Sequence, residues 1–76
     1  MAELREVPGK NQVAYFVGER RVPDAVVQSI AAKFDPMLPE FDEIMGKLEW
    51  DNMNGCYWYF WAGMYVGVEE DGYRHT

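Results

Sequence analysis

The chain has 76 residues, a formal net charge of −6, a hydrophobic share of 49% and a single cysteine, Cys56. This length predicts one compact domain over residues 1–76 with a thin stability margin, and one cysteine excludes an internal disulfide. Because His75 is the one histidine, a structural zinc site is disfavoured, and the negative charge disfavours direct binding to nucleic acid.

Short strands are predicted at the N-terminal end of the chain. Residues 4–7 are expected to form an edge strand, which leads into the turn signal Pro-Gly-Lys-Asn at 8–11. Residues 12–17 are rich in β-branched and aromatic side chains and predict a second strand. A Gly-Glu turn and a short strand over 20–22 then precede the first helix.

Two helices are predicted in the middle of the chain. Pro23 suits the first position of a helix over residues 23–34, and Asp35-Pro36 offers the start of a second helix over 37–49. Both segments carry apolar residues at helical spacing. These are Val22, Val26, Val27, Ile30 and Phe34 in the first, and Leu38, Phe41, Ile44, Met45 and Leu48 in the second.

The C-terminal third is predicted to return to strands. Residues 51–55 form a loop that ends in Asn-Gly, and an aromatic strand follows over 56–61. Ala62-Gly63 is either a turn or a bulge within one long strand, and 64–68 predicts a further strand. A polar turn and a tail complete the chain at 69–76.

The order of elements, β-β-α-α-β-β, is typical of an α+β domain. We expect a small antiparallel sheet with both helices packed on one face. The connection between the two strand groups is long, so strands from the two ends of the chain can pair within that sheet.

The aromatic strand is the most informative segment, because it carries five aromatic residues in six positions. Alternation along a strand places Cys56, Trp58 and Phe60 on one face and the other three residues on the opposite face. We expect the first face to join the core. The second face is expected to contact a partner or a second copy of the chain, through Tyr57, Tyr59, Trp61 and Tyr65. Two alternatives are a strand covered on both faces and a stacking platform for bases or sugars.

The predicted core combines the two helical stripes with the first aromatic face. Its members are Val27, Ile30, Phe34, Phe41, Ile44, Leu48, Trp58 and Phe60. Replacing Phe41 or Trp58 with alanine is expected to cost ~3–5 kcal/mol of stability.

The acidic charge is concentrated in residues 35–51, which carry six carboxylates and one lysine. We expect this segment to face a basic partner surface and to aid encounter more than folding. The predicted contact residues are Glu40, Asp42, Glu43, Glu49 and Asp51. The alternative is a solvated face that only confers solubility. Arg20-Arg21, the one basic pair, is expected to form ion pairs with the acidic helix.

Catalytic, metal and cofactor chemistry find little support in the residue inventory. Ser29 lies inside a predicted helix, so a Ser-His-acid triad has no evident assembly. Cys56 and His75 form the only thiol–imidazole pair, and we expect Cys56 to be a small buried hydrophobe. Residues 51–55 lack the ligand spacing of a calcium loop. We therefore expect no enzyme activity, no metal and no cofactor.

Protein–protein recognition is the function that these observations favour. The expected activity is inhibition, in which the acidic domain occupies a basic, nucleic-acid-binding surface of a partner. In size, acidity and lack of catalytic residues the chain resembles the small anti-CRISPR and anti-restriction inhibitors that phages use against bacterial defence. That resemblance is one of general type and assigns no residue roles.

Two alternative functions belong to other classes. The first is a homo-oligomeric structural or assembly protein, such as a homodimer, that uses its aromatic face on itself. The second is a small ligand-binding module with an aromatic pocket. The sequence shows no membrane span or signal peptide, so we expect an intracellular, cytoplasmic protein, located in the host cell if it is phage-encoded.

Overall fold

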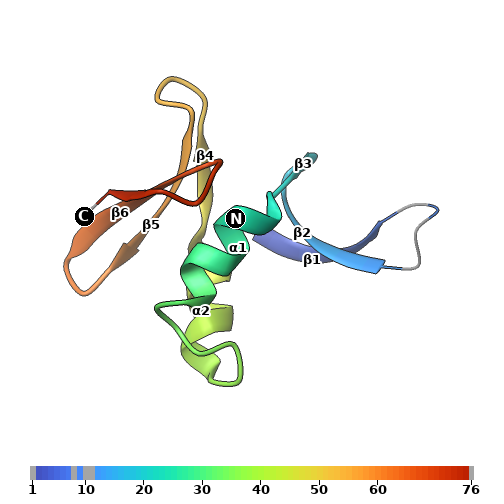
Figure 1. The fold of residues 1–76 in the computed structure, drawn as a ribbon, viewed down its shortest axis with the longest axis horizontal. Helices are drawn as coiled ribbons and strands as arrows, with labels where there is room; N and C mark the ends of the chain where they lie inside the picture. The colour runs from blue at the N-terminus through green and yellow to red at the C-terminus, as the bar shows by residue number, and fades with distance from the viewer. Residues whose placement is uncertain (1, 8, 10–11, 76) are drawn as a thin grey trace.

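The computed structural model describes residues 2–7, 9 and 12–75 of the chain. Within these residues it contains seven strands and two helices, in the order β1-β2-β3-α1-α2-β4-β5-β6-β7. The strands form two antiparallel sheets, and the helices lie between them (Figure 1). The predicted α+β class is confirmed.

The first sheet is a hairpin with a short third strand. β1 (Ala2–Val7) pairs with β2 (Gln12–Val17), which pairs with β3 (Arg20–Arg21). The turn predicted at 8–11 lies largely outside the described residues. The hairpin projects away from the helices, to the right in Figure 1, so only its near end contributes to the main core.

Both predicted helices are present and both are shorter than expected. α1 (Asp24–Ala31) follows Pro23, and α2 (Pro39–Lys47) has Pro39 in its first turn, where a missing N–H costs no helical hydrogen bond. Asp35 stabilises the turn before α2 instead of opening the helix, because its Oδ1 accepts the Met37 N–H at 2.9 Å. No helix of the described residues has the length and apolar character needed to cross a membrane.

The second sheet contains β4 (Glu49–Asp51), β5 (Cys56–Trp61), β6 (Met64–Glu69) and β7 (Arg74–His75), in that order. Ala62 and Gly63 have φ angles of 53° and 82°, and Trp61 pairs with Met64 across them. They therefore form a two-residue hairpin turn with both central residues left-handed, not a bulge. Two short strands were not predicted. β4 lies where the end of the second helix and the start of the loop were expected, and β7 lies in the expected tail.

The prediction of a single sheet is wrong. Every pairing in the structure joins strands that are consecutive in the chain, and α1 and α2 separate the two groups. Consecutive strands close short loops at low entropic cost, whereas strands from the two ends of the chain are kept apart by the helices that lie between the two sheets. The Tyr57 hydroxyl provides a side-chain link between the sheets, since it donates to the Arg21 carbonyl of β3 at 3.4 Å.

The core lies between the sheets and is formed mainly by the helices and the second sheet. Most residues of the two predicted stripes belong to it, since Val22, Val26, Ile30, Phe34, Phe41, Ile44, Met45 and Leu48 are all buried. Leu38 of the second stripe is exposed instead. The second sheet adds Tyr57, Tyr59, Val66 and Val68. Val27 only packs at the margin of this cluster.

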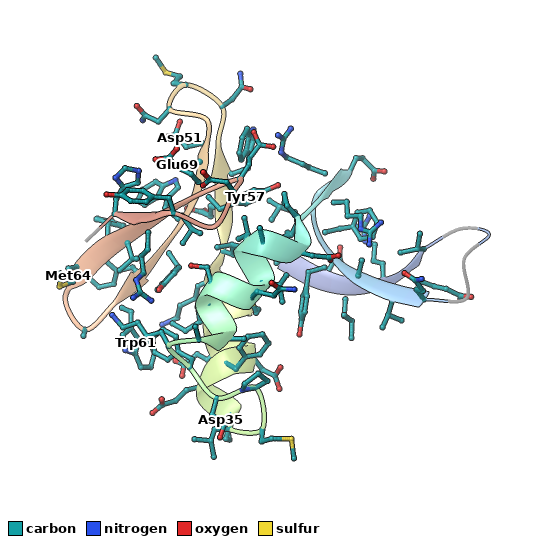
Figure 2. The ribbon with its side chains drawn as sticks, in the orientation of Figure 1. Asp35, Asp51, Tyr57, Trp61, Met64 and Glu69 are labelled. Atoms are coloured by element: carbon teal, nitrogen blue, oxygen red, sulfur yellow. The ribbon has the colours of Figure 1, made fainter. Side chains whose placement is uncertain are left out.

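The predicted orientation of the aromatic strand is wrong. Tyr57 and Tyr59 are 0% and 2% exposed, whereas Phe60 is 46% exposed and Trp58 is half-buried. Figure 2 shows Tyr57 extending from β5 toward α1 and the first sheet. The physical reason lies in β6, whose Val66 and Val68 pair with these tyrosines and direct that face toward the helices.

Candidate functional site

The face of the second sheet that points away from the helices is the candidate site, and we call it the outer face. Directly opposed residues in an antiparallel pair share a face, so the register assigns its members. They are Glu49 and Asp51 of β4, Cys56, Trp58 and Phe60 of β5, Tyr65, Gly67 and Glu69 of β6, and His75 of β7. Both helices pack against the opposite face (Figure 1).

Three aromatic side chains form the centre of the outer face. The ring centroids of Trp58 and Tyr65 lie 4.6 Å apart at an interplanar angle of 58°, and those of Phe60 and Tyr65 lie 4.8 Å apart at 64°. Phe60 is 46% exposed and Tyr65 is 63% exposed. Contiguous exposed aromatic surface of this kind is typical of an interaction site.

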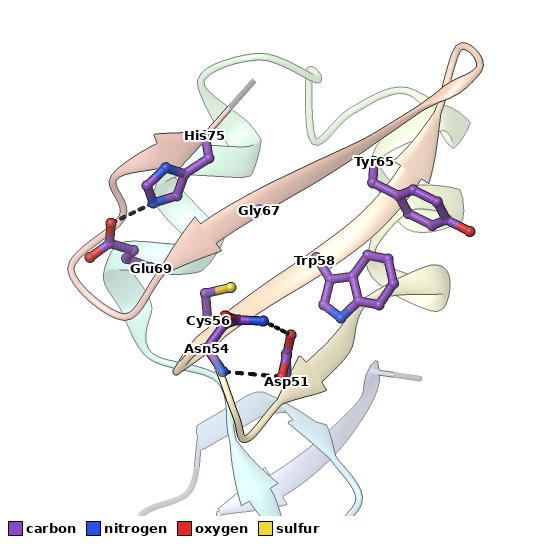
Figure 3. Close-up of a pocket in the computed structure, with 8 residues that line it drawn as sticks. All are labelled: Asp51, Asn54, Cys56, Trp58, Tyr65, Gly67, Glu69 and His75. Atoms are coloured by element: carbon purple, nitrogen blue, oxygen red, sulfur yellow. Dashed lines mark hydrogen bonds and ion pairs between the residues drawn. The ribbon is translucent and has the colours of Figure 1, made fainter.

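A hollow of about 570 Å³ lies beside this aromatic group, and we call it the Gly67 hollow (Figure 3). Its floor is at Gly67, which has no side chain to fill the space between neighbouring strands. Trp58 and Tyr65 line one end. Asp51 and Glu69 also line it, so the hollow combines aromatic and anionic groups.

The β4–β5 loop holds Asp51 in place at the hollow. Its Oδ1 accepts the backbone N–H of Met53 at 2.9 Å and of Asn54 at 3.2 Å, and its Oδ2 accepts the Asn54 side-chain amide at 2.6 Å. The hydrogen bonds from Asn54 lower the pKa of the Asp51 carboxyl. Asp51 therefore contributes a fixed negative charge.

The second carboxylate is positioned by the C-terminal strand. His75 of β7 hydrogen-bonds through Nε2 to the Glu69 Oε2, and Gly67 is the backbone partner of His75 (Figure 3). The short strand predicted as a tail thus completes one side of the hollow.

A second depression, of about 450 Å³, lies on the other side of the aromatic group. Its lining includes Gly46 and Lys47 from α2 and Glu49 from β4, and it shares Trp58 and Tyr65 with the Gly67 hollow. The two depressions make the outer face a continuous, uneven surface around the aromatic group.

The five predicted acidic contact residues do not share one surface. Glu49 and Asp51 lie on the outer face, on either side of the inward-pointing Trp50. Asp42 on α2 is close enough to Tyr15 of β2 to help raise the pKa of its phenol, after the larger effect of burial. Glu43 pairs with Lys47 at 3.5 Å, and Glu40 is exposed on the same helix. Their role in partner binding stays a prediction.

Among the predicted aromatic contacts, Tyr65 alone belongs to the outer face. Tyr57 and Tyr59 are buried, so their assignment to a contact surface is wrong. Trp61 also faces inward: its ring centroid lies 5.3 Å from that of Phe34, and the Lys47 Nζ lies 5.6 Å from it (Figure 2).

Behind the sheet, Arg20, Trp50, Tyr57 and Glu70 form a group that we call the inner cluster. The guanidinium of Arg20 lies 3.6 Å from the Trp50 ring centroid. Its Nε donates to the Tyr57 hydroxyl and its Nη2 to the Glu70 Oε2, both at 3.1 Å.

The neighbouring arginine pairs elsewhere, since the Arg21 Nη2 lies 4.0 Å from the Asp24 Oδ1. The predicted pairing of these arginines with the acidic helix α2 is therefore wrong.

Sequence reasoning missed Cys56, Trp58, Phe60, Gly67, Glu69 and His75 as members of the site. The signal that identifies most of them is the alternation in β6, where two valines separate Tyr65, Gly67 and Glu69. A two-residue turn at Ala62-Gly63 then places Phe60 opposite Tyr65 and Trp58 opposite Gly67. His75 had no comparable signal, because two-residue strands lack a pattern.

The expected absence of enzyme activity stays a prediction, and the outer face holds the thiol–imidazole pair that bears on it. The structure brings Cys56 and His75 to the same hollow, but the His75 ring hydrogen-bonds to Glu69 and not to the thiol. Burial, with added repulsion from Asp51 and Glu69, raises the pKa of the Cys56 thiol. A raised pKa disfavours the nucleophilic thiolate. Within the described residues, no three His, Cys, Asp or Glu side chains form a group that could hold a metal ion.

Comparison with protein-family models, with curated proteins and with solved structures found no match to this chain.

Proposed function

We propose that this chain is a protein–protein recognition domain whose outer face binds a basic surface of a partner protein. One observation carries the proposal: exposed Phe60 and Tyr65, with Trp58, lie on the same open sheet face as three carboxylates. Tryptophan and tyrosine are enriched among the few residues that carry most of the binding energy at protein interfaces, and complementary charge supplies orientation and a fast association rate.

The charge argues for a cationic protein partner over nucleic acid. Glu49, Asp51 and Glu69 lie within the same face as the aromatic rings, so a phosphate backbone laid across the rings would meet three negative charges. The net charge of −6 adds to this repulsion.

The same charges argue against pairing of two outer faces. A two-fold dimer brings the same patch of each copy together, and here that would oppose carboxylates to carboxylates. Like charges brought together at an interface cost several kcal/mol. A partner of different sequence and opposite charge can contact the aromatic rings and pair its cations with the carboxylates.

Competition with nucleic acid is the proposed consequence of binding. A basic surface that accepts this acidic face is of the kind that also binds phosphates, so the domain would act as an inhibitor by occupying it. The acids of α2, Glu40 and Glu43, add long-range attraction from outside the contact area.

The test isolates the partner and then asks which surface it uses. Wild-type protein is immobilised, and the proteins that it retains from a cell lysate are purified. The double variant Glu49→Lys, Glu69→Lys is then compared with the wild type for binding to each of them. Association rates are then measured across a salt series, with duplex nucleic acid as competitor. We expect binding to weaken as salt rises, because screening at ~0.15 M shortens the range of electrostatic attraction to ~8 Å. We also expect duplex nucleic acid to displace the domain from the partner.

The matched control is Glu40→Lys, Glu43→Lys, which changes the net charge by the same amount on α2. We expect this control to slow association moderately while leaving the contact intact, and the outer-face variant to abolish binding. Equal effects of the two variants, or binding that neither salt nor nucleic acid affects, would contradict the proposal. Circular dichroism melts confirm that both variants stay folded.

A further inference from the structure

We infer that the Gly67 hollow receives a single arginine side chain of the partner protein. The inference rests on the proposed function and goes further, because it names the chemical group that the hollow recognises. Four observations support it: the aromatic wall of the hollow, its charge, its shape, and the inner cluster, which already binds the guanidinium of Arg20.

The aromatic wall provides ring surface for a planar cation. Trp58 and Tyr65 both line the hollow, with ring centroids 4.6 Å apart and planes inclined by 58°. A guanidinium group is planar and weakly hydrated and is attracted to aromatic ring faces. An ammonium group is more strongly hydrated, so lysine loses more on entering such a site.

The hollow draws negative charge from two carboxylates. Its lining, drawn from the described residues, includes Asp51 and Glu69 but no lysine or arginine. Three N–H groups already donate to the Asp51 oxygens, so this residue contributes mainly charge. The hydrogen bond of Glu69 with His75 involves Oε2, so Glu69 is the better acceptor for a guanidinium N–H at its other oxygen.

The inner cluster shows how this chain binds a guanidinium group. There, Arg20 lies 3.6 Å from the Trp50 ring centroid, donates to a tyrosine hydroxyl and forms an ion pair with Glu70 at 3.1 Å. The Gly67 hollow brings together the same three residue types: a tryptophan, a tyrosine and a glutamate, with an aspartate in addition. The inner cluster takes its arginine from β3, whereas the hollow faces outward.

The shape of the hollow depends on Gly67. A Cβ atom at this position would lie 3.7 Å from the His75 Cβ and 3.8 Å from the Cys56 Sγ, which are ordinary contact distances. The fold therefore tolerates an alanine here, and the added methyl group would occupy the floor of the hollow. Gly67→Ala consequently changes the shape of the site without changing its charge.

The test uses blocked tripeptides as defined probes. Gly-Arg-Gly, Gly-Lys-Gly and Gly-citrulline-Gly, each acetylated and amidated, are titrated into the ¹⁵N-labelled wild-type protein and followed by nuclear magnetic resonance. Citrulline keeps the planar shape of arginine without the charge. We expect the arginine peptide to shift the Gly67 amide and the Trp58 indole signals with a dissociation constant on the order of millimolar. The lysine peptide should bind at least about three-fold more weakly, and the citrulline peptide should leave the signals unchanged.

Three variants locate the binding. Glu69→Gln should weaken the arginine peptide about three-fold, the effect of losing one exposed ion pair. Gly67→Ala should weaken binding of the arginine peptide by a similar factor, because the added methyl group occupies the floor of the hollow. Glu40→Gln, which removes an equal charge from α2, should leave binding unchanged. Unchanged melting temperatures confirm that each variant is folded.

The inference is overturned if no peptide shifts the hollow, if lysine binds as tightly as arginine, or if citrulline binds equally. It is also overturned if Glu40→Gln weakens binding as much as Glu69→Gln does. Such results leave the proposed function standing when the purified partner still depends on Glu49 and Glu69. Conversely, a partner that ignores the outer-face charge reversal refutes the proposed function, whatever the peptides do.

Discussion

The two faces of the second sheet carry similar residue types but differ in what surrounds them. On the inner face, Trp50 and Tyr57 contact Arg20, which reaches them from the first sheet. On the outer face, Trp58 and Tyr65 stand beside Asp51 and Glu69, in a hollow that no arginine of the described residues lines. Residue composition alone therefore does not separate core from contact surface in a small protein. The separation depends on which other parts of the chain reach each face.

The largest expected difference between the faces is in stability. Tyr57→Ala removes a ring that is 0% exposed and should cost ~3–5 kcal/mol, whereas Phe60→Ala removes one that is 46% exposed and should cost about 1 kcal/mol or less. Urea unfolding of the two variants beside the wild type measures both values. Equal losses would show that the outer face is covered in the isolated protein.

Alkaline pH should weaken the inner face selectively. Burial raises the pKa of Tyr57 and Tyr59, while in the unfolded chain tyrosine loses its proton near pH ~10. Above that pH the unfolded state binds fewer protons, so the free energy of unfolding falls by up to ~1.4 kcal/mol per pH unit for each buried tyrosine. Below pH ~10, both tyrosines are protonated in the folded and the unfolded state, and the full stability is retained.

Unfolding curves at pH 9, 10 and 11 test this dependence, with Tyr59→Phe as the comparison. The variant should lose less stability between pH 10 and pH 11 than the wild type does. A wild-type unfolding free energy that stays constant across this range would mean that the two hydroxyl groups ionise as freely in the fold as in the unfolded chain.

Removing the inner arginine should make the two faces more alike. Arg20→Ala deletes the cation above Trp50 and two hydrogen bonds, and we expect a loss of ~1–2 kcal/mol. Arg21→Ala is the matched control, because Arg21 only approaches the exposed Asp24 at 4.0 Å, and it should cost ~0.5 kcal/mol or less. Thermal melts of the two variants compare them directly, and an equal loss would show that the inner cluster adds nothing specific.

The smallest predicted effect distinguishes the two buried tyrosines. Tyr57 has hydrogen bonds to Arg20 and Arg21, while the Tyr59 hydroxyl is buried without a partner among the described residues. Tyr57→Phe should therefore lower stability by ~1 kcal/mol, and Tyr59→Phe should raise it by about 1 kcal/mol, because it removes an unsatisfied group. Chemical denaturation resolves this change of sign, and a destabilising Tyr59→Phe would point to an undetected partner for that hydroxyl.

Much of the fold was predictable from local patterns. The helical stripes identified Ile30, Phe34, Phe41, Ile44 and Leu48 as core residues, and all five are buried. These predictions succeeded because the stripes repeat over several helical turns. The number of sheets was not predictable in this way, since pairing between strands depends on how the helices fill the space between them.

The candidate site was predicted only in part, because the aromatic strand is apolar on both faces. Alternation within it leaves the choice of face open, and the preference of interfaces for tyrosine and tryptophan favours the wrong face as the contact surface. The neighbouring strands decide the choice: in β4, Trp50 lies between two acids, and in β6 two valines alternate with Tyr65, Gly67 and Glu69. Reading the three strands together, in register, assigns the outer face correctly.

The placement of the three tryptophans gives the protein an optical reporter of its outer face. Trp50 lies under Arg20 and Trp61 packs against Phe34, both on the inner face, whereas Trp58 lines the Gly67 hollow. A variant that keeps Trp58 and replaces the other two with phenylalanine would emit fluorescence from the outer face alone. A soluble quencher would then report, without any attached dye, whether that face is open or occupied.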